Sequence, residues 1–162
     1  MIEAMLEQAV IAALKTGELS SVRFEGVWQP ANDAGKVKGL EPTEDVVEVG
    51  VATSLREYET FTSQRANVQV SWTVASRLDR DVTGERFRAA VSHIIAILHT
   101  WQMSLPAVKA VFALADTDEA FAPCGFRLAG ATPTKSDRAW IATGTFTLRG
   151  VISNLQSAQL ST

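Results

Sequence analysis

Apolar residues recur at steps of three and four positions in two segments of the chain, the spacing that places them along one face of a helix. The segments are residues 2–14 and 84–101. Thr83 precedes the second segment and is a residue type that caps helices, while Val82 and Phe87 have the spacing of a hydrophobic staple. The pattern predicts two amphipathic helices, of which the second is the main cover of a sheet.

Strict alternation of apolar and polar residues predicts the strands, because successive side chains of a strand point to opposite faces. The alternation is clearest around Trp72, where apolar residues take the even positions and polar residues the odd ones. The strands expected from this pattern are 22–28, 47–51, 67–74, 126–129 and 140–149. The run 108–114 fits the helical and the strand period about equally, and we favour a strand.

The order helix, strands, helix, strands predicts an α+β fold, with an antiparallel or mixed β-sheet and two amphipathic helices packed on one of its faces. We expect a single domain over residues 1–152 and a loose tail over 153–162. Three polar stretches, 31–44, 52–66 and 132–139, are expected to project as loops. The second stretch fits either a projecting loop or the outer part of a long hairpin.

The charge balance counts against a protein that grips nucleic acid. Among 162 residues, 15 Lys and Arg stand against 18 Asp and Glu, a formal net charge of −3, with both signs spread along the chain. Proteins that hold nucleic acid phosphates usually carry a basic stripe. The chain also has no apolar run long enough to cross a bilayer and does not open like a secretory signal, which predicts a cytoplasmic product with no membrane partner.

Residues with catalytic chemistry are few and poorly placed. His93 and His99 are six positions apart on one predicted helix, so they lie on different faces, and we expect both at boundary or surface positions. Ser92 cannot pair with the adjacent His93, because neighbouring helical residues point away from each other. Cys124 is the only cysteine and is expected to be a small buried residue. We expect no enzyme, no catalytic residue and no cofactor.

An acidic cluster at Asp116, Asp118 and Glu119 resembles the start of a calcium-binding loop only superficially. Such a loop requires Gly at its sixth position and Glu at its twelfth, where this chain has Phe121 and Arg127. We therefore expect no metal site. The tryptophans fall on the apolar parity of their elements, which predicts core packing rather than a base-stacking platform; they are Trp28, Trp72, Trp101 and Trp140.

Several short strings occur in an order that resembles a known family. They are Trp28-Gln29-Pro30, the valine strand 46–51, Asn67-Val68-Gln69-Val70-Ser71-Trp72-Thr73-Val74, the helix 84–101, Gly125-Phe126-Arg127-Leu128 and Trp140-Ile141-Ala142-Thr143-Gly144-Thr145-Phe146. Together they resemble the tail terminator, or tail completion, proteins of long-tailed bacteriophages. The resemblance spans roughly residues 2 to 150 and rests on element order rather than on a signature motif.

The resemblance implies a small α+β subunit that assembles with itself into a ring, commonly a hexamer, on the end of the tail tube. There the ring stops tube polymerisation and docks the tail to the head. Its partners would be the tail tube protein and a head-completion or neck protein, and DNA would pass through without sequence-specific binding. The protein would be located in the virion, at the tail or neck, after assembly in the host cytoplasm. The resemblance carries no catalytic residue and no cofactor.

A ring joined head to tail needs two different complementary surfaces on each subunit, which the polar loops would supply. The residues nominated for a subunit or partner interface are Lys36, Lys38, Arg56, Glu57, Tyr58, Arg65, Lys135, Asp137 and Arg138. Three alternative functions stay open. They are another neck component such as a head-completion or stopper protein, a small enzyme with His93 or His99 as base, and a ligand- or nucleic-acid-binding module, which would require a basic or aromatic surface.

Overall fold

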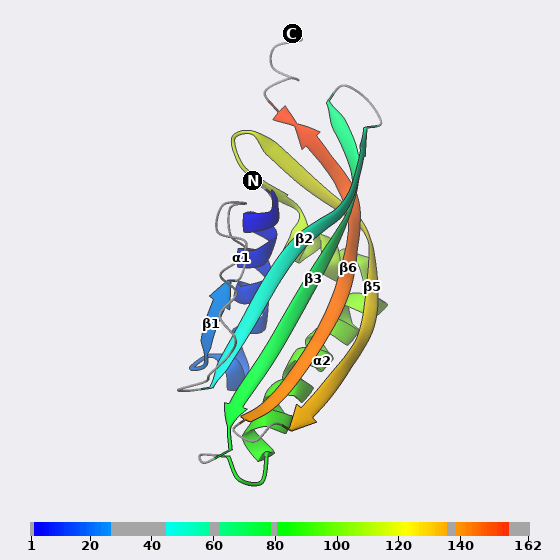
Figure 1. Cartoon of the computed structure of the whole chain (residues 1–162). Helices are drawn as coiled ribbons and strands as arrows, with labels where there is room; N and C mark the ends of the chain where they lie inside the picture. Colours follow the sequence, from blue (N-terminus) through cyan, green and yellow to red (C-terminus); the bar gives the residue numbers. More distant parts are fainter. Residues whose placement is uncertain (1, 27–44, 59–61, 79–80, 136–138, 156–162) are drawn as a thin grey trace.

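The computed structural model describes residues 2–26, 45–58, 62–78, 81–135 and 139–155 (Figure 1). In chain order the elements are α1 (Ile2–Leu14), the short 3-10 helix η1 (Gly17–Leu19), β1 (Arg23–Gly26), β2 (Val46–Tyr58), β3 (Ser63–Arg77), α2 (Glu85–Met103), α3 (Leu105–Phe112), β4 (Leu114–Ala115), β5 (Glu119–Lys135) and β6 (Ala139–Asn154). The expected loop at 31–44 lies outside the described residues.

The strands form one mixed six-stranded sheet in the order β1-β2-β3-β6-β5-β4. The β1–β2 pair is parallel and the other neighbours are antiparallel. The helices pack on one face of this long sheet, and the other face of the central strands is not covered by any described helix (Figure 1). The predicted α+β class, with helices on one face of a mixed sheet, is confirmed.

The central strand β3 follows the predicted alternation. Val68, Val70 and Trp72 are buried under the helices, and the residues between them point to the open face. β3 pairs with β6 from end to end and with β2 as far as Tyr58, which lies opposite Gln64. The stretch 52–66 is therefore the outer part of a long hairpin, and the projecting loop expected there is wrong.

The loop expected at 132–139 is also wrong for most of its length. β5 runs on to Lys135 and β6 begins at Ala139, with Thr132 paired to Thr143 and Lys135 to Trp140. Threonine suits a strand with one solvated face, so a polar stretch of this composition continues the ladder. At the other end β6 reaches Asn154, so the expected tail begins later than residue 153, and residues 156–162 lie outside the described part.

In the run 108–114, which fitted two periods, residues 108–112 belong to helix α3 (Leu105–Phe112), so the favoured strand is wrong there, while Leu114 begins the short strand β4. The hydroxyl of Ser104 accepts a hydrogen bond from the Ala107 backbone N–H at 3.2 Å, and Pro106 stands in the first turn of α3. Both are start signals of a helix. Val108 and Phe112, one helical turn apart, are buried. In the described ranges no single helix is long and apolar enough to span a membrane, and α2 with α3 meets that description only across a 111° bend.

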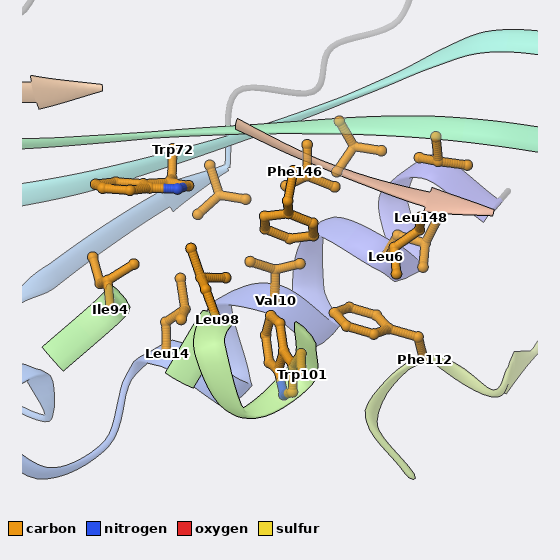
Figure 2. Close-up of a cluster of buried hydrophobic side chains, with 14 of the residues drawn as sticks. Leu6, Val10, Leu14, Trp72, Ile94, Leu98, Trp101, Phe112, Phe146 and Leu148 are labelled. Carbon is orange, nitrogen blue, oxygen red and sulfur yellow. The ribbon is translucent and has the colours of Figure 1, made fainter. Parts of the chain in front are cut away.

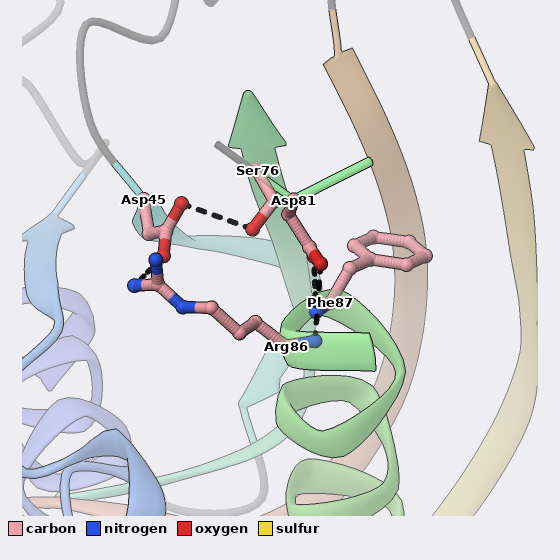
Figure 3. A network of polar contacts seen from close by, with 5 residues as sticks. All are labelled: Asp45, Ser76, Asp81, Arg86 and Phe87. Atoms are coloured by element: carbon pink, nitrogen blue, oxygen red, sulfur yellow. Dashed lines mark hydrogen bonds and ion pairs between the residues drawn. The ribbon is translucent and has the colours of Figure 1, made fainter. Parts of the chain in front are cut away.

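The start of α2 differs from the predicted capping. The N-cap is Gly84, with φ of 73°, and no side chain caps the helix from that position. The Asp81 carboxylate instead accepts the backbone N–H groups of Arg86 and Phe87, at 3.4 and 2.9 Å (Figure 3). Val82 is 76% exposed. The expected Thr83 cap and hydrophobic staple are therefore wrong.

The core lies between the helices and the sheet (Figure 2). It is built from α1, α2, α3 and the inner positions of β3 and β6, with Leu6, Val10, Leu14, Trp72, Ile94, Leu98, Trp101, Phe112, Phe146 and Leu148 all nearly inaccessible to solvent. Trp101 is central, with its ring against those of Phe112 and Phe146 at centroid distances of 5.0 and 5.8 Å. Core packing is confirmed for Trp72 and Trp101. Trp140 is half-buried, and Trp28 lies outside the described residues.

Candidate assembly surface

The face of the sheet opposite the helices carries a band of hydroxyl side chains. Over residues 65–74 of β3 and 142–152 of β6, the odd positions are exposed or half-buried and the even positions between them are buried. The register places Ser71 beside Thr145 and Thr73 beside Thr143, whose hydroxyl oxygens are 3.4 Å apart. We call this surface, from Glu25 on β1 to Arg127 on β5, the open face. The described helices all lie on the other side of the sheet (Figure 1).

The β5 side of the open face is basic. Arg127 lies opposite Thr147, and Arg149 lies opposite Gly125, so the two arginines are diagonal neighbours on the same face. A Cβ placed on Gly125 would be 3.6 and 3.8 Å from the Cβ and Cδ of Arg149, which shows that the arginine stem crosses this glycine. Both arginines are exposed, and neither forms an ion pair with any described residue.

The β1–β2 side of the open face is acidic. Glu25 and Glu48 lie directly opposite each other in the parallel β1–β2 pair. The guanidinium of Arg23 is 3.2 Å from the Glu25 carboxylate. Burial raises the pKa of Glu48, the nearby Glu25 carboxylate raises it further, and Arg23 lowers it in part. Two carboxylates facing each other across strands repel, and the single Arg23 guanidinium offsets that repulsion only in part.

A Glu48→Gln variant is expected to unfold with a slightly larger free energy than the wild type at pH 7, by less than about 0.5 kcal/mol. A raised pKa means that the ionised carboxylate costs stability in the folded state, so this cost grows as the pH rises through the folded pKa of Glu48 and vanishes in acid. Urea unfolding at pH 7 and pH 4 measures the difference. Glu57→Gln is the control, because Glu57 lies opposite Arg65 and gains nothing from neutralisation. A gain at Glu48 of equal size at both pH values would contradict this explanation.

The nominated interface residues do not gather in one place. Glu57 and Arg65 are exposed and opposite each other at the outer end of the β2–β3 hairpin. Lys135 lies at the other end of the sheet, where its Nζ is 5.1 Å from the ring centre of Trp140. Arg56 and Tyr58 belong to β2, but the structure describes only their backbone. The remaining nominees, Lys36, Lys38, Asp137 and Arg138, lie outside the described residues.

A cavity of about 430 Å³ lies between η1, the start of β2, the end of β3 and the first turns of α2. Three of its polar side chains, Asp45, Ser76 and Arg86, are paired with one another. The Arg86 guanidinium binds the Asp45 carboxylate, which also accepts the Ser76 hydroxyl at 3.0 Å (Figure 3). The network joins two strands to the start of α2, so its evident role is to fix this end of the sheet.

A smaller apolar groove of about 330 Å³ separates the α2 N-terminus from the β5–β6 hairpin. Phe87 and Trp140 stack there with centroids 5.9 Å apart, and the Trp140 indole N–H donates to the Asp81 carbonyl oxygen at 2.9 Å. Lys135 covers the outer side of the same ring. The groove therefore presents mainly aromatic and aliphatic surface, with Thr83, Thr134 and Lys135 among the residues that line it.

The histidines do not form a catalytic pair. His93 is half-buried, with Nε2 3.2 Å from the Thr16 hydroxyl oxygen, and His99 is exposed on α2, as predicted. Among the described residues, no group of three His, Cys, Asp or Glu side chains is placed to hold a metal ion. Asp116 uses its carboxylate to accept the backbone N–H groups of Asp118 and Glu119, both at 2.7 Å, so it closes a turn.

Two features of the surface were not anticipated from the sequence. Cys124 is exposed at a bulge in β5, so its predicted burial is wrong. The acidic and basic sides of the open face are the second feature. In the sequence, Arg127 and Arg149 show only as polar residues that alternate with apolar ones. Their odd positions in two strands of one expected hairpin were a signal that both point to the same face.

No protein-family model matches this chain, and no curated protein matches it significantly. Among solved structures, the chain is similar to a chain from the virion of a native gene transfer agent (GTA) particle, with a TM-score of 0.53 and 12% sequence identity. That match covers 93% of this chain and 97% of the other. A second solved chain, 11% identical over 91% of this chain and 92% of its own length, has a TM-score of 0.42. The first likeness shows a shared fold along almost the whole length of both chains.

Proposed function

We propose that this chain is a structural protein of a phage-like particle and acts as a tail terminator. In this role it forms a ring with copies of itself on the end of the tail tube, stops tube polymerisation and provides the surface to which the head docks. The observation that carries the proposal is the fold shared with a chain of a GTA virion, almost end to end. Fold alone does not determine function, so the surfaces must also suit the role.

The described surfaces suit a ring subunit better than an enzyme. A ring of identical subunits joined head to tail requires two different surfaces on each subunit. The acidic and basic sides of the open face differ in this way. The formal net charge of −3 agrees with a ring through which DNA passes without its phosphates being gripped.

The test is electron microscopy of the purified protein alone and after addition to tail tubes polymerised from the tube protein. We expect rings, or caps at tube ends, and tubes that stop growing once capped. Binding to DNA-filled heads but not to tubes would instead favour a head-completion or stopper protein. Failure to form rings and to bind either partner would contradict the proposal.

A matched control removes the only histidines, by His93→Ala and His99→Ala in one chain. The tail terminator proposal expects capping to survive this change once the fold has been verified by circular dichroism. Loss of capping by a folded double variant would favour a function that depends on histidine chemistry.

A further inference from the structure

We propose that the acidic β1–β2 side of the open face binds the basic β5 side of a second copy of this chain, with Glu25 and Glu48 of one subunit facing Arg127 and Arg149 of the next. The inference rests on the proposed ring function and names the contact that would close the ring. None of these four contact residues is among the interface residues expected from the sequence.

The positions of the charges suit a lateral, head-to-tail contact. In the sheet order, β1 and β5 are separated by β2, β3 and β6. At about 4.8 Å between neighbouring strands, Glu25 on β1 and Arg127 on β5 are roughly 19 Å apart across the face, and Glu48 on β2 and Arg149 on β6 are roughly 10 Å apart. Glu48 and Arg149 are also separated along the strands, because Glu48 lies level with Thr143 of β6, six positions before Arg149. One subunit therefore cannot neutralise its own pair of sides, whereas a neighbour placed beside it brings opposite charges together. Repeating the same contact gives a closed ring or an open helix rather than a two-fold dimer.

Within the described chain the basic side has no acidic partner, and the acidic side is only partly paired. Arg127 and Arg149 have no ion pair there, and only Arg23 offsets the repulsion between Glu25 and Glu48. A neighbour's guanidinium groups would remove that repulsion and form paired hydrogen bonds with the carboxylates. Complementary charge of this kind fixes the register and orientation of a contact.

The edge of β5 argues for contact through side chains rather than through a sheet continued between subunits. β4 pairs only with Ala120 and Phe121, so most of β5 is an edge strand among the described residues. Pro123 and Pro133 remove backbone donors from this edge, and two register shifts interrupt it. The Leu128 N–H already donates to the Gln102 side-chain oxygen at 2.9 Å. Strand-to-strand pairing is therefore disfavoured at this edge.

The experiment reverses one charge on each side, in separate chains, as Glu48→Arg and Arg127→Glu. Each variant alone places like charges at every contact, so we expect association at least about tenfold weaker than that of the wild type. Mixing the two variants restores opposite charges at every contact of an alternating ring, and so does combining both changes in one chain. Native mass spectrometry and light scattering measure assembly, both free in solution and in the presence of tail tubes.

Lys109→Glu is the matched control, because Lys109 is exposed on α3, on the helical side of the sheet. Like Arg127→Glu, it replaces a positive charge by a negative one, but it leaves the open face unchanged. The Lys109→Glu variant should therefore assemble as well as the wild type. Thermal unfolding of each variant verifies the fold before assembly is compared.

The outcomes separate this inference from the proposed function. Two non-assembling variants that assemble when mixed support the contact. Variants that assemble as well as the wild type, or that stay apart when mixed, overturn the contact while the capping function stands. A wild-type chain that stays monomeric both in solution and on tubes overturns the contact and the ring function together.

Discussion

A Trp101→Ala variant is expected to lose about 3–5 kcal/mol of its free energy of unfolding, as large aromatic truncations in cores do. Trp101 is 4% exposed and lies on α2 where it meets α3 and the β5–β6 pair. Its ring makes edge contacts with Phe112, Phe126 and Phe146 at centroid distances of 5.0, 6.0 and 5.8 Å. Removing it opens a cavity shared by three elements, which cannot collapse without moving a helix off the sheet.

Urea unfolding followed by circular dichroism measures this loss. Trp101→Phe should cost less than half as much as Trp101→Ala, because it keeps an aromatic ring among the three phenylalanines. His99→Ala is the control on the same helix, since His99 is exposed and its removal should change stability by no more than about 0.5 kcal/mol. A Trp101→Ala variant that loses under about 1 kcal/mol would contradict the central position given to this residue.

The sequence predicted those elements whose period is unambiguous. The alternation around Trp72 corresponds to β3, because only one face of that strand is buried over most of its length. The outer half of β2 was less readable, since the register shift between Thr53 and Leu55 breaks the alternation on which a strand is recognised. For α3 the apolar positions fitted both periods, and the deciding signals were Ser104 and Pro106 just before and at its start.

The interface charges depend on long-range neighbours that the order of elements does not reveal. β6 lies between β3 and β5, so residues from three distant segments share the open face. The sequence shows that Arg149 alternates with apolar residues, but not that Gly125 lies beneath its stem. Polar composition therefore predicts loops and interfaces at 52–66 and 132–139, which are largely strands, and gives no signal for the charged residues inside strands. Sheet order is set by packing across the whole domain, which local patterns do not encode.

Replacing Gly144 by Ala is expected to lower the free energy of unfolding by about 1–3 kcal/mol, the usual cost of overpacking. Gly144 lies directly opposite Trp72, and an added Cβ would clash with two carbons of the indole ring. Trp72 is 1% exposed and fixed between the sheet and the helices, so the ring cannot turn away. Gly130→Ala is the control, because nothing lies within 4 Å of a Cβ at that position.

The clash explanation makes a second, sharper demand. If Trp72 is the group that meets the new methyl, then Gly144→Ala should cost much less in a Trp72→Leu background than in the wild type, a non-additivity typical of residues in contact. Equal costs in both backgrounds would mean that Gly144 is needed for backbone reasons instead. If Gly144→Ala costs little free energy of unfolding in the wild-type background, where Trp72 is present, then β6 moves to accommodate the methyl. Because Thr143 and Thr145 flank this glycine on the open face, a displaced β6 would also weaken assembly, so light scattering of Gly144→Ala links the packing of the core to the proposed ring.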